Sequence, residues 1–206
     1  MSEEGGSGPR RRRSPEEAER EILEAAEAFL MQRPFREMSV EELMARTGLS
    51  RQAFYAYFGD RYRLVERLLE RSAAALFEIE RGWLEGADSR EVLKETIEEG
   101  TEFFARRGPL LRAIADASAG DAEVERLYRS GFVERFVSAV ATRIEEGIAG
   151  GEMPELADPE QIARALVWMS ERYWLETLGR EPRQSTESVV RALYTVWTRA
   201  LYGSDD

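Results

Sequence analysis

The stretch TGLSRQAFYAYFGDR, residues 47–61, places four aromatic rings and two arginines directly after a Thr-Gly pair. Gly48 can adopt the left-handed conformation that ends a helix, and Ser50 can accept hydrogen bonds from the first free amides of a new one. Gly59 and the aspartate after it then interrupt the pattern again. These signals predict a short helix over residues 50–58.

The side chains of this short helix fall on two different faces. Phe54 and Phe58 are four residues apart, so they share a face that can be buried. Arg51 and Tyr55 are also four apart and share another face, with Gln52 beside them. A core has no use for guanidinium, amide and phenol groups on its second face, so this face is a candidate binding surface. A plain helical hairpin, in which these groups are simply solvated, is the alternative.

A second short helix is expected just before this one. Ser39 can cap it, Glu42 can reach back to complete a capping box, and Leu43 supplies an apolar anchor. Two short helices joined by a tight glycine-containing turn form a helix-turn-helix, whose second helix can enter the major groove of double-stranded DNA. We therefore expect residues 15–60 to form a DNA-binding domain.

The polar side chains of this region are assigned by their chemistry. Arginine and glutamine can form paired hydrogen bonds with guanine and adenine edges, so Arg51 and Gln52 are the candidates for base recognition. Hydroxyl groups, and a cation at a helix N-terminus, suit phosphate contacts, which set register rather than sequence preference. The candidates for phosphate contacts are Ser39, Tyr55, Tyr57 and Arg61.

Charge is distributed unevenly along the chain. The formal net charge of −11 disfavours a polyanionic partner for the chain as a whole. Residues 33–63, however, hold six arginines against four acids. Residues 1–14 are expected to be a flexible basic arm that follows the DNA backbone or enters the minor groove, and a solvated tail is the alternative. The basic residues of this arm are Arg10, Arg11, Arg12 and Arg13.

The composition removes most enzyme chemistry. The 206 residues include no cysteine and no histidine, which excludes thiolate nucleophiles, histidine general bases and most zinc sites. We therefore expect that the protein is not an enzyme and that it binds neither a cofactor nor a metal ion. No stretch is apolar enough to span a membrane, and the N-terminus lacks the apolar region of a secretory signal. A cytoplasmic location is expected.

Apolar residues recur at helical spacing along the whole chain, and no alternating strand pattern competes with them. This periodicity predicts an all-α protein of about nine helices. The fourth helix is expected to run from Arg61 to about Glu85. About five more helices follow, separated by breaks at residues 86–88, 107–109, 119–121, 150–159 and 179–185.

Residues 39–61 resemble the signature of the TetR/AcrR family of bacterial transcriptional repressors, including a Tyr-x-Tyr-Phe element at residues 55–58. The resemblance is specific over residues 18–65. Two positions depart from the family pattern. Ala53 stands where a small hydroxyl residue is usual, which removes a phosphate contact worth about 1 kcal/mol. Arg61 stands where lysine is usual, which keeps the charge.

The C-terminal part resembles the EthR-like branch of this family, at residues 169–175, 196–197 and 201–203. The resemblance implies that residues 61–206 form a ligand-binding and dimerisation domain with a pocket for an effector. Few polar groups lie among the aromatic residues of this region, so we expect a hydrophobic small molecule. The alternative is that these aromatic residues are plain core. The candidate pocket residues are Thr96, Phe103, Ser170, Trp174 and Trp197.

Two further features of this region bear on its partners. The sequence does not decide whether Glu95, Glu99 or Glu171 faces inward. An inward-facing acid would bind a ligand that carries a positive charge. The last two helices carry apolar residues on two sides, so one side can pack inward and the other against a second copy, as the family resemblance also implies. On the first of these helices, one side is formed by Ile162, Ala165, Leu166 and Met169, and the other by Trp168 and Leu175. On the second, one side is formed by Val189, Leu193, Val196 and Ala200, and the other by Val190, Tyr194 and Trp197.

These expectations describe a ligand-responsive transcriptional repressor. A homodimer formed through the last two helices would bind a palindromic operator, and a hydrophobic molecule would release it. The alternative from another class is a helical adaptor that binds only protein. Replacement of Arg51 or Tyr55 by alanine separates the two, because an adaptor would not depend on either side chain.

Overall fold

The computed structural model describes residues 14–86 and 90–203, so the expected arm residues Arg10 to Arg13 lie outside the described part. All regular structure in the described part is helical, which confirms the all-α prediction. None of the helices described there is long and apolar enough to cross a membrane. The α-helices are α1 (Pro15–Leu30), α2 (Val40–Thr47), α3 (Arg51–Tyr57), α4 (Arg61–Leu84), α5 (Arg90–Ser118), α6 (Ala122–Tyr128), α7 (Glu134–Ala149), α8 (Pro159–Leu178) and α9 (Thr186–Tyr202).

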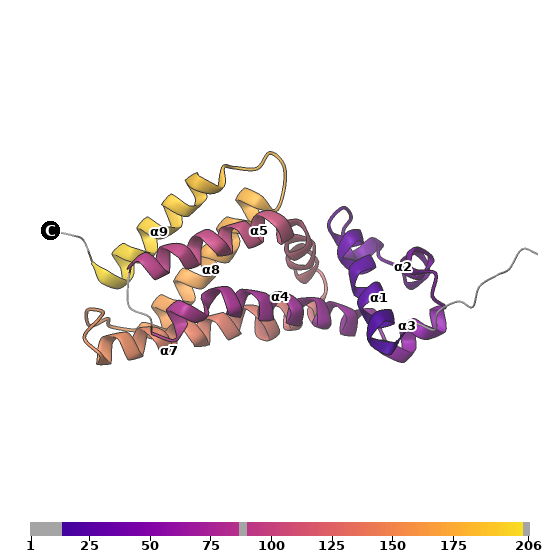
Figure 1. The fold of residues 1–206 in the computed structure, drawn as a ribbon, viewed down its shortest axis with the longest axis horizontal. Coiled ribbons are helices and arrows are strands. Elements are labelled where there is room, and N and C mark those ends of the chain that lie inside the picture. Colours follow the sequence, from indigo (N-terminus) through magenta and orange to yellow (C-terminus); the bar gives the residue numbers. More distant parts are fainter. Residues whose placement is uncertain (1–13, 87–89, 204–206) are drawn as a thin grey trace, which may run out of the picture.

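The molecule is elongated, with α1, α2 and α3 at one end and α5 to α9 forming the larger remainder (Figure 1). The small end has an apolar core that is continuous with that of the larger part, and in it Ile22, Phe29 and Phe54 are completely buried and Leu43 almost so. The side chain of Ser50 caps α3 by accepting a hydrogen bond from the Ala53 amide at 3.2 Å. Burial of one apolar face therefore fixes the orientation of each short helix.

The helix α4 connects the two ends of the molecule (Figure 1). Asp60 caps its start, because its carboxylate accepts hydrogen bonds from the amides of Tyr62 at 2.8 Å and Arg63 at 2.9 Å. Leu64 and Leu68, on its first two turns, are completely buried. Further along, α4 packs against α5 and α7. A change in the larger part can therefore reach the small end through one continuous helix.

The break expected at residues 107–109 is wrong. The helix α5 continues through Pro109 from Arg90 to Ser118. Proline has no amide hydrogen, so its presence leaves the carbonyl of Ala105 without its usual partner in the helix. The side chain of Arg183 replaces that partner, with Nη1 donating to the Ala105 oxygen at 2.8 Å. A residue 78 positions away thus makes the proline tolerable inside α5.

The grouping expected for the last two helices is partly wrong. Leu175, assigned to a second side of α8, is 1% exposed and lies in the core. On α9, Trp197 is buried together with Val189 and Leu193, which precede it at four-residue intervals. Val196, assigned to the same side as Val189, is 42% exposed instead. One side of α9 therefore closes the core, and Val196 lies outside it.

Candidate DNA-binding face and effector cavity

The turn between α2 and α3 has the expected geometry. Gly48 has a φ of +66°, a left-handed conformation that favours glycine. Ser39 caps α2 by accepting from the Glu42 amide at 3.2 Å. The capping box expected there is not completed, because the Glu42 carboxylate is turned toward Arg33, with which it forms an ion pair, and Arg46, at 3.7 Å. Electrostatic attraction to two arginines thus outweighs a local backbone hydrogen bond.

The outer face of α3 is exposed as expected. Phe54 and Phe58 are buried on one side, at 0% and 5% exposure. Outside this buried face, Arg51 and Gln52 are exposed and Tyr55 is 47% exposed, while Tyr57, on the opposite flank near the helix end, is 37% exposed. The two tyrosines are among the few large apolar side chains exposed in the described residues. These exposed side chains make the outer face of α3 a candidate binding surface.

The Arg51 side chain is held by two neighbours. Its guanidinium forms an ion pair with Glu41 of α2. It also donates to the Tyr55 hydroxyl at 3.4 Å and lies 5.9 Å from the centre of the Tyr55 ring. These contacts extend the guanidinium along the outer face of α3. Because the side chains of Arg51 and Glu41 are 56% and 70% exposed, an anionic partner can displace the carboxylate at little cost.

The other residues expected to contact DNA lie in different surroundings. The Ser39 side chain is exposed at the start of α2, where its oxygen serves as the cap. Arg61 is half-buried, with its guanidinium 4.8 Å from the ring centre of Phe35 and 5.5 Å from that of Tyr62. Phe35 belongs to a short 3-10 turn, Phe35–Glu37. The Arg61 side chain therefore packs against this 3-10 segment.

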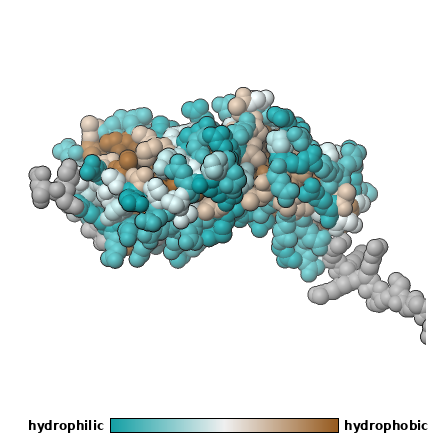
Figure 2. All heavy atoms as spheres, turned by 90° about the horizontal axis from the view of Figure 1, so that it is seen from above, coloured by the Kyte–Doolittle hydropathy of each residue, from teal (hydrophilic) through white to brown (hydrophobic). Residues whose placement is uncertain are grey.

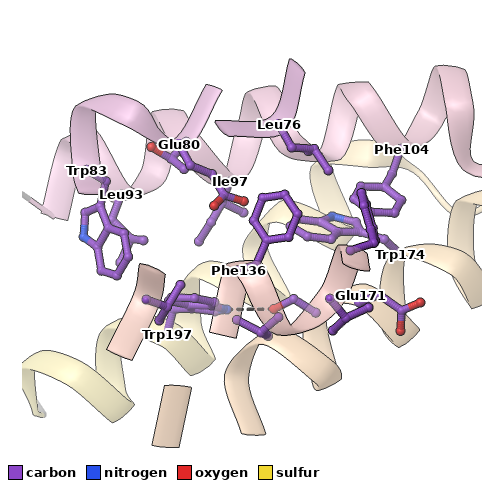
Figure 3. Close-up of a pocket in the computed structure, with 16 residues that line it drawn as sticks. Leu76, Glu80, Trp83, Leu93, Ile97, Phe104, Phe136, Glu171, Trp174 and Trp197 are labelled. Carbon is purple, nitrogen blue, oxygen red and sulfur yellow. Dashed lines mark hydrogen bonds between the residues drawn. The ribbon is translucent and has the colours of Figure 1, made fainter. Parts of the chain in front are cut away.

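A narrow cavity lies inside the larger part, between α4, α5, α7, α8 and α9, with the π-helical segment Arg129–Val133 at one wall (Figure 3). The volume available to water-sized molecules is about 60 Å³. Most of its lining is apolar. The lining residues are Leu76, Glu80, Trp83, Leu93, Thr96, Ile97, Phe104, Phe132, Val133, Phe136, Val140, Val167, Ser170, Glu171, Trp174 and Trp197.

The structure brings four of the five expected pocket residues to this cavity, namely Thr96, Ser170, Trp174 and Trp197. Phe103 does not line it. Phe103 is buried elsewhere, edge-on to Phe104 at 5.7 Å. Phe104 takes the place at the wall and stacks on Trp174 with a centroid distance of 4.7 Å. The two phenylalanines are adjacent in the chain, so periodicity alone did not decide which one faces the cavity.

The polar groups of the tryptophans at the cavity are already satisfied. Trp197 donates to the Ser170 hydroxyl at 2.8 Å (Figure 3). Trp174 donates to the Thr101 hydroxyl at 3.0 Å. These bonds fix the orientation of both indole rings across α5, α8 and α9. The cavity wall is therefore a preformed aromatic surface.

Two carboxyl groups also face the cavity. Glu171 lines it, whereas Glu95 and Glu99 are exposed. Glu80 also lines the cavity and was not among the expected residues, although it follows Leu76 by four residues and precedes Trp83 by three on the same helix face. Burial raises the pKa of Glu80 to about 8. Burial also raises the pKa of Glu171, while a hydrogen bond from Tyr128 acts in the opposite direction.

Both parts of the chain match known families. Residues 22–68 match the tetR family of bacterial regulatory proteins, and residues 93–203 match the C-terminal domain of the transcriptional regulator EthR. The HTH-type transcriptional regulator EthR of Mycolicibacterium smegmatis is 27% identical over 205 residues, which cover 95% of this chain and 93% of the relative. The EthR of Mycobacterium tuberculosis H37Rv is 28% identical over 206 residues, with coverage of 96% and 94%.

Solved structures share the fold. A TetR-family regulator from Syntrophomonas wolfei aligns with a TM-score of 0.78 and 20% identity, covering 91% of this chain and 96% of its own. GusR of Salmonella enterica aligns with a TM-score of 0.76 and 19% identity, covering 93% and 99%. The fold and the two family matches define a helix-turn-helix transcriptional regulator. The chain belongs to the TetR family, and its C-terminal domain is of the EthR type.

Proposed function

We propose that this regulator is a repressor that binds a palindromic operator as a homodimer and is released by a hydrophobic small molecule. The observation that carries the proposal is the exposed polar face of α3, opposite the buried Phe54 and Phe58. Residues 15–60 serve as the DNA-binding domain and residues 61–206 as the ligand-binding and dimerisation domain. The regulator acts in the cytoplasm, because the DNA that it binds lies there.

On the DNA, Arg51 and Gln52 contact base edges in the major groove, because they occupy the first turn of α3 and are exposed. Tyr55, Tyr57 and Ser39 contact phosphates on either side of the groove. Arg61 reaches a phosphate by leaving its position over Phe35. The basic residues of the arm, outside the described part of the chain, add contacts that depend on salt but not on sequence.

The homodimer forms through α8 and α9. Ala165 and Val196 are exposed on these helices, and Trp168 is only partly covered. Seen from above, apolar residues gather on the half of the molecule that carries α8 and α9, while most of the other half is hydrophilic (Figure 2). A second copy on this surface gives two-fold symmetry. The two α3 helices then fit half-sites about 34 Å apart, or a multiple of that spacing.

The effector acts by enlarging the cavity. Its volume of about 60 Å³ is far below the roughly 300–1,000 Å³ of pockets that hold drug-sized ligands. A ligand therefore enters only if the walls separate. One wall is formed by Leu76, Glu80 and Trp83 of α4, whose other end begins at the DNA-binding domain. The ligand lowers operator affinity to the extent that it favours the separated state.

Footprinting of the purified protein on the DNA that flanks its own gene tests the function. We expect a protected stretch with two-fold sequence symmetry. Addition of a cavity ligand should remove the protection at unchanged protein concentration. Protection of no sequence in that DNA, with the folded protein present in excess, would contradict operator binding and favour an adaptor that binds only protein.

A further inference from the structure

The charged side chains that line the cavity are all acidic. Of its 16 lining residues, two carry carboxyl groups, Glu80 and Glu171, and none is arginine or lysine. The remaining lining is apolar or aromatic apart from Thr96 and Ser170. A ligand with a negative charge would therefore meet two acids and no compensating base. The charge distribution of the cavity favours a ligand that carries a positive charge.

Glu80 has no partner of its own. Among the described residues, no hydrogen bond or ion pair reaches its carboxyl group, whereas Glu78 on the outside of α4 pairs with Arg81 at 3.2 Å. Every fully enclosed side-chain nitrogen or oxygen in the described residues has a partner, so the carboxyl oxygens of Glu80 must border open space. Figure 3 shows the side chain descending from α4 toward the space bordered by Ile97 and Phe136.

Glu171 is a different case. Its carboxylate accepts a hydrogen bond from Tyr128, which is itself buried. Arg172 also stabilises its charged form. In Figure 3 it lies beside Trp174, away from Trp83 and Glu80. Glu171 is therefore a satisfied structural group, and Glu80 is the free acid of the cavity.

The surroundings of Glu80 suit an organic cation. Trp83, one turn further along α4, lies edge-on to Trp197 with a centroid distance of 5.7 Å. Aromatic rings stabilise ammonium groups through their faces, and the effect grows when water is excluded. Whereas the Trp83 ring already has the guanidinium of Arg143 5.6 Å from its centre, a cation at this end of the cavity would meet the Glu80 carboxylate and the Trp197 indole. Its apolar remainder would extend toward Phe104 and Trp174.

We propose that the effector is an amine with an apolar body, and that Glu80 binds its ammonium group. This inference rests on the proposed function, because it assigns the chemistry of the ligand at the same cavity. The charge and the hydrophobicity of the cavity define this class of ligand. A neutral ligand gains at most a hydrogen bond with this carboxyl group, a carboxylate finds no cation in the lining, and only an ammonium group gains an ion pair there.

Three compounds of equal chain length test the proposal: octylamine, octanol and octanoate. Binding is followed through tryptophan fluorescence, since Trp83, Trp174 and Trp197 line the cavity. For the unaltered protein at neutral pH we expect octylamine to bind at least about tenfold more tightly than octanol, with octanoate weakest. Glu80→Gln should abolish the preference for the amine. Glu78→Gln, which removes a carboxylate from the outer side of the same helix, should keep it.

The possible outcomes separate this inference from the function on which it rests. If octanol binds as tightly as octylamine, or if Glu80→Gln keeps the amine preference, the assignment of Glu80 is wrong while the cavity remains a ligand site. If none of the three compounds binds or changes operator affinity, the cavity itself is not the effector site. Proton release measured by calorimetry in two buffers gives a readout on the unaltered protein, because an acid that pairs with an ammonium group must lose its proton. Absence of release would contradict the pairing.

Discussion

Arg107 of α5 forms an ion pair with Glu27 of α1, and Arg71 of α4 lies 3.5 Å from the same carboxylate. The side chains of Glu27 and Arg107 are only 21% and 25% exposed, so this contact is partly shielded from solvent. It joins the DNA-binding end to the two helices that line the cavity from one side. Under the proposed mechanism, movement of α4 or α5 around a ligand would act on α1 directly.

Removal of this contact should weaken the communication between cavity and DNA. In Glu27→Gln, the factor by which a cavity ligand lowers operator affinity is expected to fall, because α1 loses its charged connection to α4 and α5. Operator affinity measured with and without ligand gives this factor. Glu24→Gln, an exposed acid on the same helix paired with Arg20, is the control. An unchanged factor in Glu27→Gln would exclude this route.

The acid that lines the cavity on α4 predicts how stability depends on pH. Burial raises the pKa of Glu80 from 4.5 to about 8, so the folded state keeps a proton that the unfolded state has already lost. Stability from this group is therefore present below about pH 4.5 and is lost as the pH rises toward 8. In urea denaturation, the free energy of unfolding of Glu80→Gln should rise relative to that of the unaltered protein as the pH increases over this window. The rise is at most about 1.4 kcal/mol per pH unit.

A matched neutral variant on the same helix checks this result. Glu78→Gln should show no such trend, since Glu78 is 70% exposed and paired with Arg81. Glu171, whose pKa burial also raises, contributes in the same direction but is present in all three proteins. A difference between Glu80→Gln and the unaltered protein that stays constant with pH would contradict the burial of this carboxyl group.

Two glycines of α5 should respond oppositely to alanine. A Cβ at Gly100 would meet the Trp174 ring at 3.5 Å, an ordinary contact, so Gly100→Ala should stabilise the protein by about 0.5–1 kcal/mol. A Cβ at Gly108 would come within 3.1 Å of the Gly179 backbone, which cannot move aside without shifting the end of α8. Overpacking of this kind costs about 1–3 kcal/mol and outweighs the gain in helix propensity. Denaturant unfolding of both variants measures the difference, and equal stabilisation would contradict the close contact.

The proposed dimer can be tested at one exposed apolar residue. Val196 on α9 is 42% exposed, and Val196→Asp would place a charge in the apolar surface that a second copy covers. We expect a monomer in analytical ultracentrifugation, together with weaker operator binding. Thr195→Asp, at the exposed neighbouring position, should remain dimeric. A dimer that survives Val196→Asp would place the interface elsewhere.

Local signals in the sequence predicted the small end of the molecule well. Gly48, Ser50 and Asp60 specify where α2 ends and where α3 and α4 begin, and each acts through its own backbone or its nearest neighbours. The orientation of α3 followed from the four-residue spacing of Phe54 and Phe58. Such features depend on residues close in the chain, so the sequence alone suffices to place them.

Features that depend on distant residues were not predictable in the same way. The helix α5 tolerates Pro109 because Arg183 donates to the Ala105 carbonyl, and nothing near Pro109 announces that bond. The choice of Phe104 over Phe103 at the cavity depends on the position of Trp174. Glu80 was missed for a related reason, because a charged residue on a helix is ordinarily assigned to the solvent side.

The most direct test of the central claim is the effect of Arg51→Ala on operator binding, measured by fluorescence anisotropy on the footprinted duplex. We expect a loss of about 1–3 kcal/mol and reduced discrimination against a scrambled duplex. Arg106→Ala, which removes an exposed arginine that lies outside the helix-turn-helix and pairs with Glu102 on α5, should bind as the unaltered protein does. If Arg51→Ala binds the operator with full affinity and selectivity, the outer face of α3 is not the DNA-reading surface.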